Sequence, residues 1–371
     1  MDPATLEYLI VREIRKAREI SRKDLAELLD IAKSTAGRRI DSMIERGIVT
    51  EIGIENRKEV GRPRRFLALR GDFGGFIGLD FDARNLFAVF IDFAQTTIEQ
   101  RKIRLSAKPT AEEVLTHFRS LIREFTANRD GLPIRGIGIG VPGHLHREAR
   151  TGLHYEFIDD WKDVDLLKEL DLTPDLLQIE NNTRAIALGE YWLGPHSAAK
   201  HLVCISVRTG ISSAVIANGE IVSGRNEKAG EIRGWMVPTG DRETPSSHCI
   251  EKVGTIRAVT NGSGITDESW QEFLKSCREG DAEALNLLTK LAGMHGDIAA
   301  RFVQLLDPEV IFFSGPFTEL DDIYLDRVRE ATTTALTGHY FETPPIRRVS
   351  LGEFAGAQGA AALAASESRQ L

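Results

Sequence analysis

Residues 21–51, with the sequence SRKDLAELLDIAKSTAGRRIDSMIERGIVTE, restrict the fold of this chain more than any other stretch. Ser21 can cap a first short helix, and Asp24 stands three residues later in the capping-box position. A turn at Asp30 and Ile31 is expected to end that helix. Its apolar face, at helical spacing, is predicted to consist of Leu25, Leu28 and Leu29.

A second helix is predicted over residues 33–46, and its two faces differ in chemistry. Its apolar side chains, Ile40, Met43 and Ile44, are expected to point inward. Two short helices joined by a tight turn are typical of a helix-turn-helix, whose second helix touches base edges with its N-terminal half. The alternative is a small helical hairpin with a solvated basic face. The outward residues, which are the candidates for DNA contact, are Lys33, Ser34, Thr35, Arg38 and Arg39.

The flanking segments extend this pair to a winged helix. Asp2 and Pro3 are typical of a helix start, so a further helix should pack on the pair. Residues 48–53 and 65–69 have the composition of strands, with a polar, glycine-containing loop between them. A proline-stiffened arginine tip can enter a minor groove, whereas a basic linker would contact only phosphates. The tip candidates are Arg62, Pro63, Arg64 and Arg65.

Charge divides the chain into a basic head and an acidic body. Residues 1–70 hold 16 Lys and Arg against 12 Asp and Glu, a net of +4, whereas the whole chain of 371 residues carries −8. This asymmetry fits a DNA-binding module attached to a larger domain. The 3 cysteines lack C-x-x-C spacing, which favours a reducing compartment. With no apolar run of membrane length and no signal peptide, we expect a cytoplasmic protein without membrane contact.

The larger domain is expected to begin after residues 71–75, GDFGG, where the pattern changes to alternating strands and helices. Buried strands are predicted at residues 134–140 and 309–315, and each runs into a Gly/Pro turn. Two halves with matching strand ends predict a duplicated α/β domain whose lobes enclose a cleft. Ligands in such folds bind at the carboxyl ends of the strands.

Several motifs occur in a characteristic order: GRP at 61–63, IGIGVPG at 137–143, IENNTRAIALGE at 179–190, AGEI at 229–232, LDPEVIFFSG at 306–315 and GEFAGAQGAAALAA at 352–365. In this order the chain resembles the ROK family (repressor, open reading frame, kinase), which joins bacterial sugar kinases and sugar-responsive repressors. The resemblance covers essentially the whole chain. It implies an α/β fold in which an N-terminal winged helix-turn-helix precedes a two-lobed actin/hexokinase-like (ribonuclease H-like) domain. The expected domains are 1–70 for the winged helix and 71–371 for the ROK domain, with lobes at about 71–181 plus 353–371 and 182–352.

Both loops that face the nucleotide in kinases of this family have changed here. Such kinases open with a loop resembling D-x-G-G-T, and the corresponding residues 80–85 read DFDARN. The glycines of this loop are gone, and Phe81 and Asp82 add bulk and negative charge. The second loop, similar to G-T-G-I-G-G-G, reads RTGISSA at residues 208–214. The resemblance therefore implies that this chain has lost its cradle for ATP phosphates.

The resemblance also locates the catalytic base of the kinases, the aspartate of E-N-D-A-N. Here Asn182 stands at that position. An amide cannot take the proton of a sugar hydroxyl at neutral pH, and general-base help is worth roughly 10²–10⁴ in rate. We predict no catalytic residues, no cofactor and no enzyme activity. The alternative is a ROK-family sugar kinase that phosphorylates a hexose with ATP.

The family's zinc and sugar sites survive only in part. The zinc site needs a histidine after AGEIG and a cysteine cluster, but here Arg233 follows AGEI and only Cys249 of the cluster remains. We therefore expect no metal site, and Cys249 as a small buried hydrophobe. Amide and carboxylate groups that suit hydroxyls remain, although solvated surface acids are the alternative. The effector candidates are Asn181, Asn182, Glu231 and Glu251.

Together these features predict a DNA-binding transcriptional regulator of the repressor type. Its inactive, sugar-kinase-like domain would support dimerisation and sense a carbohydrate. The expected partners are a double-stranded DNA operator, a sugar or sugar-derivative effector, and further copies of the chain in a homodimer or higher homo-oligomer. A regulator that answers to a partner protein, with no small ligand, is a third alternative.

Overall fold

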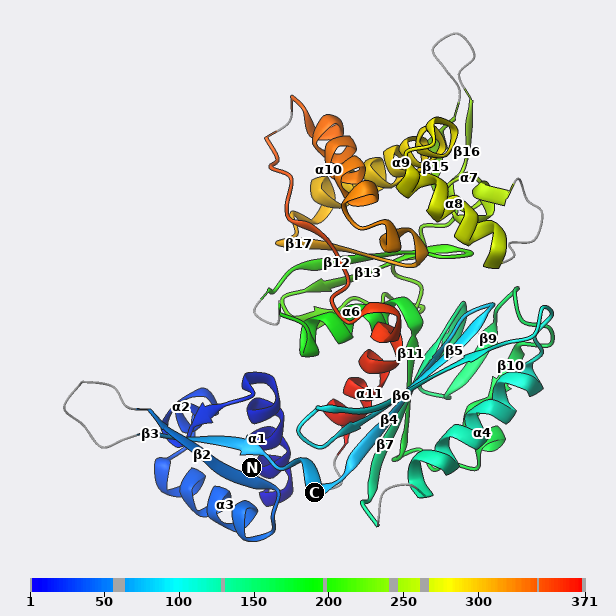
Figure 1. Ribbon diagram of the computed structural model, residues 1–371. Coiled ribbons are helices and arrows are strands. Elements are labelled where there is room, and N and C mark those ends of the chain that lie inside the picture. The colour runs from blue at the N-terminus through cyan, green and yellow to red at the C-terminus, as the bar shows by residue number, and fades with distance from the viewer. Residues whose placement is uncertain are drawn as a thin grey trace. The chain divides into compact units, whose positions relative to one another are not determined.

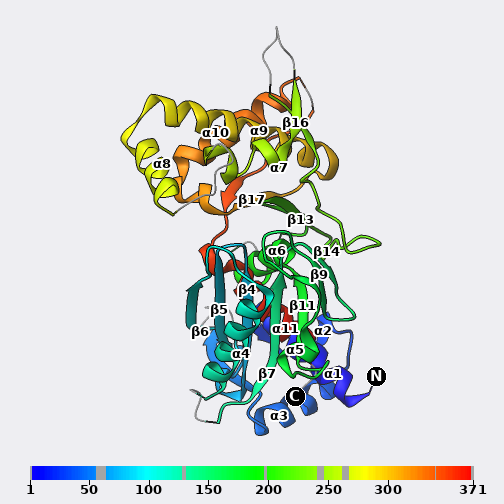
Figure 2. The same cartoon turned by 90° about the vertical axis from the view of Figure 1, so that its right-hand side faces the viewer.

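The computed structural model describes residues 2–55, 64–127, 131–195, 199–239, 246–260, 267–338 and 340–368. It divides into two compact units, one of residues 1–180 with 357–371 and one of residues 181–356. Each unit is built on a sheet of its own (Figures 1 and 2). The chain therefore passes between the units at residues 180–181 and again at 356–357. No described helix is both long enough and apolar enough to cross a membrane.

The first unit begins with the predicted winged helix. Its sheet has the order β1-β3-β2, and its wing strands are antiparallel, with Val49 opposite Leu69. The short β1 was not expected from the sequence, because its two residues owe their strand conformation to pairing with Phe66 and Leu67. The elements are α1 (Pro3–Ala17), β1 (Ile20–Ser21), α2 (Arg22–Leu28), α3 (Lys33–Glu45), β2 (Val49–Glu55) and β3 (Arg64–Leu69).

The predicted helix starts are confirmed at α1 and α2. Asp2 accepts hydrogen bonds from the first amides of α1, and Ser21 accepts one from the amide of Asp24 at 3.1 Å. The expected apolar face of α2 is wrong at Leu28, which is 59% exposed. This helix is short, and Leu25 and Ala26 already fill its core side.

A mixed sheet in the order β11-β7-β4-β5-β6 forms the body of the first unit. Strands β4 and β7 run parallel, and β4, β5 and β6 follow each other antiparallel. Helices α4 and α11 cover its opposite faces (Figures 1 and 2). The elements are β4 (Gly75–Phe81), β5 (Asn85–Asp92), β6 (Thr97–Arg104), α4 (Ala111–Ala127), β7 (Ile134–Val141), β11 (Leu177–Asn181) and α11 (Ala355–Glu367), with the turn η1 (Gly71–Phe73) before β4.

Helix α11 lies unusually close to this sheet, because glycines of the sheet face the helix backbone. A Cβ atom on Gly138 of β7 would lie 1.8 Å from the carbonyl oxygen of Ala360. A Cβ atom on Gly78 of β4 would lie 1.9 Å from the carbonyl oxygen of Ala357. The glycines of the IGIG motif and the alanines of the C-terminal motif are thus two sides of one contact.

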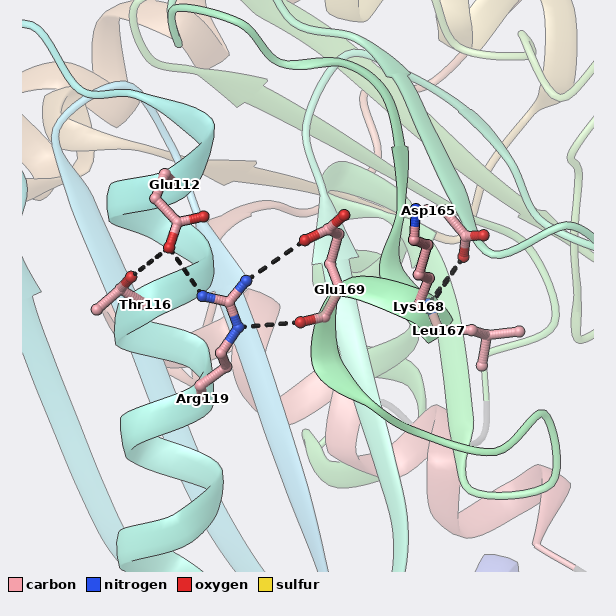
Figure 3. Close-up of polar contacts among 7 residues, drawn as sticks. All are labelled: Glu112, Thr116, Arg119, Asp165, Leu167, Lys168 and Glu169. Carbon is pink, nitrogen blue, oxygen red and sulfur yellow. Dashed lines mark hydrogen bonds and ion pairs between the residues drawn. The ribbon is translucent and has the colours of Figure 1, made fainter.

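On the other face, α4 is fastened to the short helix α5. Arg119 of α4 donates to the backbone oxygen of Glu169 at 2.9 Å and lies 3.4 Å from its carboxylate (Figure 3). Glu112 lies 2.9 Å from the same guanidinium, so two carboxylates share one cation. Helix α5 follows a small sheet in the order β10-β9-β8. These elements are β8 (His144–His146), β9 (Thr151–His154), β10 (Lys162–Asp165) and α5 (Leu166–Leu170).

The second unit repeats the plan with the sheet order β14-β13-β12-β17-β18. Helix α6 covers one face, and α9 and α10 cover the other (Figures 1 and 2). The sheet consists of β12 (Leu202–Val207), β13 (Ile211–Ala217), β14 (Glu220–Ile221), β17 (Val310–Ser314) and β18 (Ile346–Arg348). The remaining elements are α6 (Asn182–Leu193), β15 (Met236–Pro238), β16 (Ser247–Cys249), α7 (Ile250–Val253), η2 (Ile256–Thr260), α8 (Asp267–Glu279), α9 (Ala282–Leu306), η3 (Pro316–Leu320), α10 (Asp322–Leu336) and η4 (Gly352–Phe354).

A fully buried histidine lies in the core of the second unit. His295 of α9 is 0% exposed, and its Nε2–H donates to the carbonyl oxygen of Gly254 at 2.6 Å. Its Nδ1 therefore accepts from the hydroxyl of Tyr324 at 2.8 Å. Both ring nitrogens are satisfied in the neutral form, and burial lowers the pKa of His295 to about 4.

Candidate functional site

Helix α3 presents a polar face from a firmly anchored base. Ala36, Ile40 and Met43 are buried and hold the helix against the rest of the winged helix. Lys33, Ser34 and Arg38 are exposed, and Thr35 is half-buried. Cations and hydroxyls thus gather on the N-terminal half of the helix, which is the part that reaches base edges in a helix-turn-helix.

Arg39 and Arg65, which we expected to contact DNA, are ion-paired within the winged helix. Arg39 lies 3.5 Å from the buried carboxylate of Glu7 in α1, and Arg65 lies 2.7 Å from Glu51 in β2. Hydrogen bonding by Arg65 lowers the pKa of Glu51. Arg64 begins β3, although its side chain lies outside the described structure, as do Arg62 and Pro63 altogether. These pairs tie the helices and wing together, so Arg38 and Lys33 are the better candidates for reading DNA.

Arg22 orients α3, a role that was not predicted from the sequence. It starts α2 and lies 2.7 Å from Asp41 of α3 and 2.9 Å from Glu51 of β2. One guanidinium thus joins two helices and the wing. Its partners are far away in the sequence, so no spacing rule could have found them.

The loop that corresponds to the first nucleotide-facing loop of ROK kinases is closed by one of its own side chains. Residues 82–85 form a tight turn in which Asp82 Oδ1 accepts from the amides of Arg84 and Asn85 at 2.8 and 2.9 Å. A phosphate loop would leave such amides for the ligand. Phe81 is fully buried, and its ring centre lies 4.6 Å from that of Trp161, so Phe81 belongs to the core. This loop carries a fixed negative charge where a phosphate would need donors.

The second nucleotide-facing loop has similar obstacles. The amide of Ser213 donates to Gly230 at 2.8 Å, and the hydroxyls of Ser212 and Thr183 are hydrogen-bonded. A Cβ atom on Gly210 would lie 3.1 Å from a carboxylate oxygen of Glu251, so that carboxylate sits against the loop. A carboxylate against the loop would repel a phosphate group bound there.

The four effector candidates all belong to the second unit, at the start of α6 and in the segments around 230 and 250. Asn181 caps α6, since its Oδ1 accepts from the amides of Thr183 and Arg184 at 3.0 and 3.3 Å. Asn182 and Glu231 are half-buried, as is Glu251. Asn181 therefore has a structural role, and the three half-buried groups are the better placed to meet a ligand.

Backbone and side-chain hydrogen bonds link these segments. Ser213 of β13 binds Gly230, the neighbour of Glu231, and the amide of Glu251 donates to Arg233 at 3.3 Å. Thr183, beside Asn182, binds Ser212 of the same strand. The segments that carry Asn182, Glu231 and Glu251 are thus connected to one another through β13 and the residues around 230.

Arg184 is the main residue of this region that sequence reasoning missed. It is 1% exposed in the first turn of α6 and donates to the backbone oxygen and carboxylate of Glu227 at 3.0 and 3.2 Å. A buried charge needs such a partner. The pair fixes the loop that leads to Glu231.

The zinc-site remnants take other partners. The thiol of Cys249 donates to the backbone oxygen of Arg233, and His248 is hydrogen-bonded to Thr239 at 2.7 Å. Cys249 is half-buried rather than buried as expected, because it lies at the end of the short strand β16. Within the described ranges, no group of three or more His, Cys, Asp or Glu side chains is arranged to hold a metal ion.

Known proteins share both parts of this architecture. Two family models match, one described as the ROK family over residues 76–367 and one described as winged helix-turn-helix DNA-binding over residues 5–50. A putative xylose repressor from Caldicellulosiruptor sp. (strain Rt8B.4) is 26% identical over 342 residues, covering 86% of this chain and 85% of that protein. A glucokinase from Halalkalibacterium halodurans is 24% identical over 308 residues, covering 76% of this chain and 93% of that protein.

A crystal structure of a ROK family transcriptional regulator, described as a homolog of the E. coli MLC protein, shares the whole fold. Its TM-score is 0.76 at 17% identity, with 99% of this chain and 98% of that chain covered. The predicted fold class is thereby confirmed, from the winged helix to the two-lobed domain. Relatives of the larger domain include both repressors and glucokinases, so the chemistry of the loops must decide between the two.

Proposed function

The chain belongs to the ROK family, and from this premise we propose that it is a DNA-binding transcriptional repressor acting in the cytoplasm. The observation that carries the proposal is the polar N-terminal half of α3, where Lys33, Ser34 and Arg38 are exposed above a buried apolar base. The resemblance to proteins named xylose repressors supports the same function. Binding to duplexes selected from a random-sequence library tests it, and failure to enrich any sequence would overturn it.

Arg38→Ala is expected to weaken binding to the selected duplex by about 1–3 kcal/mol if Arg38 reads a base edge. Arg39→Ala is the matched control, because its guanidinium pairs with Glu7. Fluorescence anisotropy titrations at several salt concentrations measure both. An equal loss for Arg38→Ala on selected and random duplexes would limit Arg38 to phosphate contact.

We further propose that the chain works as a homodimer, with two winged helices on two half-sites. Helix-turn-helix proteins commonly pair in this way, and half-sites then lie about 34–36 Å apart or at multiples of that spacing. The selected duplex should therefore contain an inverted repeat. Light scattering with and without the duplex checks the number of chains.

The larger domain is proposed to be inactive as a kinase. Asn182 stands in place of the base, Asp82 occupies the amides of the first loop, and Glu251 lies against the second. Asn182→Asp should therefore restore no ATP-dependent phosphorylation of glucose, xylose or mannose, since both loops remain unsuited to phosphates. A coupled assay for ADP, with the parent chain beside the variant, measures this. Turnover by either protein would favour the alternative, a ROK-family sugar kinase.

A carbohydrate is the proposed effector, bound by Asn182, Glu231 and Glu251. Carboxylates accept hydrogen bonds from sugar hydroxyls, and amides both accept and donate them, so binding needs no phosphate contacts. D-xylose is the first sugar to test, given the names of the relatives. Glu231→Ala should abolish the effect of the sugar on duplex affinity and leave sugar-free binding nearly unchanged, whereas the exposed Glu220→Ala should respond like the parent. If the parent ignores a panel of sugars and sugar phosphates, the effector is of another kind.

A further inference from the structure

A buried arginine joins the winged helix to the body of the first unit. Arg15 of α1 is 9% exposed, and its guanidinium lies 5.6 Å from the ring centre of Phe76 and 5.0 Å from that of Phe93. Phe76 belongs to β4, and Phe93 follows β5. Burial lowers the pKa of Arg15 to about 10, which still leaves it charged at neutral pH. A cation so deeply placed needs strong partners.

Those partners come from the C-terminal end of α11. Arg15 donates to the backbone oxygen of Ala365, and the hydroxyl of Tyr8 donates to the backbone oxygen of Ser366 at 2.9 Å. The last carbonyls of a helix lack partners within the helix and carry partial negative charge, which suits a guanidinium. Helix α1 thus supplies both a cation and a hydroxyl to the end of α11. We refer to these two contacts as the Arg15 clamp.

The same helix α11 begins where the chain leaves the second unit, at residues 356–357. The segment just before it is held by α6, because the buried carboxylate of Glu190 accepts from the hydroxyl of Ser350 at 2.8 Å and the amide of Leu351 at 3.0 Å. Asn182, an effector candidate, starts α6 about 12 Å away along the helix axis. One helix therefore reaches from the candidate site to the segment that enters α11.

We propose that the Arg15 clamp makes the winged helix a rigid extension of the first unit, so that a displacement entering the first unit from residues 350–356 of the second unit is transmitted to α3. The proposal rests on the proposed function for its consequence on DNA but not for its mechanics. Without the clamp, the winged helix would depend more heavily on its covalent connection to β4 through residues 70–75. A domain on such a tether could find both half-sites whatever the arrangement of the units, and an effector would lose its influence.

The mechanics can be tested without DNA or ligand. A dye is attached at Lys23→Cys in a Cys249→Ser background, since Lys23 is exposed while Cys204 and Cys277 are buried. Time-resolved anisotropy should show the winged helix of the parent tumbling with the whole protein. Tyr8→Phe combined with Arg15→Gln should add a component several times faster. Arg12→Gln is the matched control, because Arg12 lies on the same helix and pairs with its neighbour Glu13. A fast component already present in the parent, or none in the double variant, would overturn the clamp.

The consequence for regulation is tested on the selected duplex with D-xylose as the probe. The parent should change its duplex affinity by about 5- to 150-fold when the sugar is added, and the double variant by less than about 2-fold. The double variant should still bind the sugar with the affinity of the parent, as measured by calorimetry. A double variant that responds like the parent, or one that no longer binds the sugar, contradicts the transmission.

Glu190→Gln tests the same route if the sugar does not change the duplex affinity of the parent. It should alter duplex affinity in the parent and have no effect in the double variant, because a perturbation at residues 350–351 would no longer reach α3. Glu309→Gln is the control, since Glu309 also accepts backbone amides in the second unit but binds residues 200–201. Additive effects of Glu190→Gln and the clamp variant would overturn the route. A parent that binds no duplex at all refutes the proposed function, while the anisotropy result still judges the clamp.

Discussion

Gly138→Ala is expected to destabilise the first unit by about 3 kcal/mol or more, although it adds only one methyl group. The added carbon would lie 1.8 Å from the carbonyl oxygen of Ala360 and 2.4 Å from its carbonyl carbon. The carbonyl group belongs to the backbone of α11, and the added carbon is attached directly to the backbone of β7. No side chain can therefore rotate to relieve the clash. Relief requires α11 to move off the sheet, which would also disturb the contacts at its two ends.

Gly136→Ala is the matched control, because Gly136 lies two residues earlier on the same strand and faces the same helix. Its added carbon would lie 3.2 Å from Ala364 Cβ and from a ring carbon of Phe76, which small shifts can accommodate. Urea unfolding followed by circular dichroism should show a clear loss of stability for Gly138→Ala and a loss of about 1 kcal/mol or less for Gly136→Ala. Equal effects in the two variants would mean that α11 yields easily, contrary to its tight seat on the sheet.

Acid should destabilise the second unit between pH 6.5 and 4 through His295. The pKa of a histidine in an unfolded chain is near 6.5, whereas burial lowers the pKa of His295 to about 4. Above pH 6.5 the ring is neutral in both states, and its contribution to stability is complete. As the pH falls, the unfolded chain binds a proton that the folded core refuses until about pH 4. The total loss is roughly 3 kcal/mol.

His295→Gln separates this effect from the protonation of carboxylates. The variant should be less stable at pH 7, since the hydrogen bonds to Gly254 and Tyr324 are disturbed, but its stability should fall less steeply between pH 6.5 and 4. His154→Gln, at an exposed strand end, should keep the parent's slope. Urea midpoints measured at half-unit pH steps give the slopes. Parallel curves for His295→Gln and the parent would show that the buried ring takes up its proton before the unit unfolds.

Local chemistry made much of this fold predictable. Asp2 and Ser21 cap helices because the rule depends only on neighbours a few residues away, and the strand patterns worked for the same reason. The prediction for Leu28 was wrong, because an apolar face with helical spacing can extend beyond the core on which the helix packs. The GEFAGAQGAAALAA motif indicated a family but not a role. Its role depends on glycines of β4 and β7 far away in the sequence.

The candidate site was less predictable, because its structure depends on pairs that no spacing rule connects. Arg39 had the right position to face DNA, yet Glu7 of another helix lies beside it. Arg184 and Glu227 meet across a long stretch of chain, as do Arg15 and the end of α11. The roles of Arg38, Asn182 and Glu231 remain predictions. Sequence reasoning locates residue types on elements, but which charge meets which is decided only when the elements pack.

The packing of α11 on the sheet of the first unit has a consequence for synthesis on the ribosome. The sheet can be laid down once residue 180 has emerged, but the helix that covers the Gly78 and Gly138 face is made only after the whole second unit. Since the ribosome adds about 5–20 residues per second, one face of the nascent sheet stays uncovered for roughly 10–40 s. During that time it is a natural client for a chaperone. Slowing translation within the second unit should therefore increase aggregation of the chain more than slowing it within the first 70 residues.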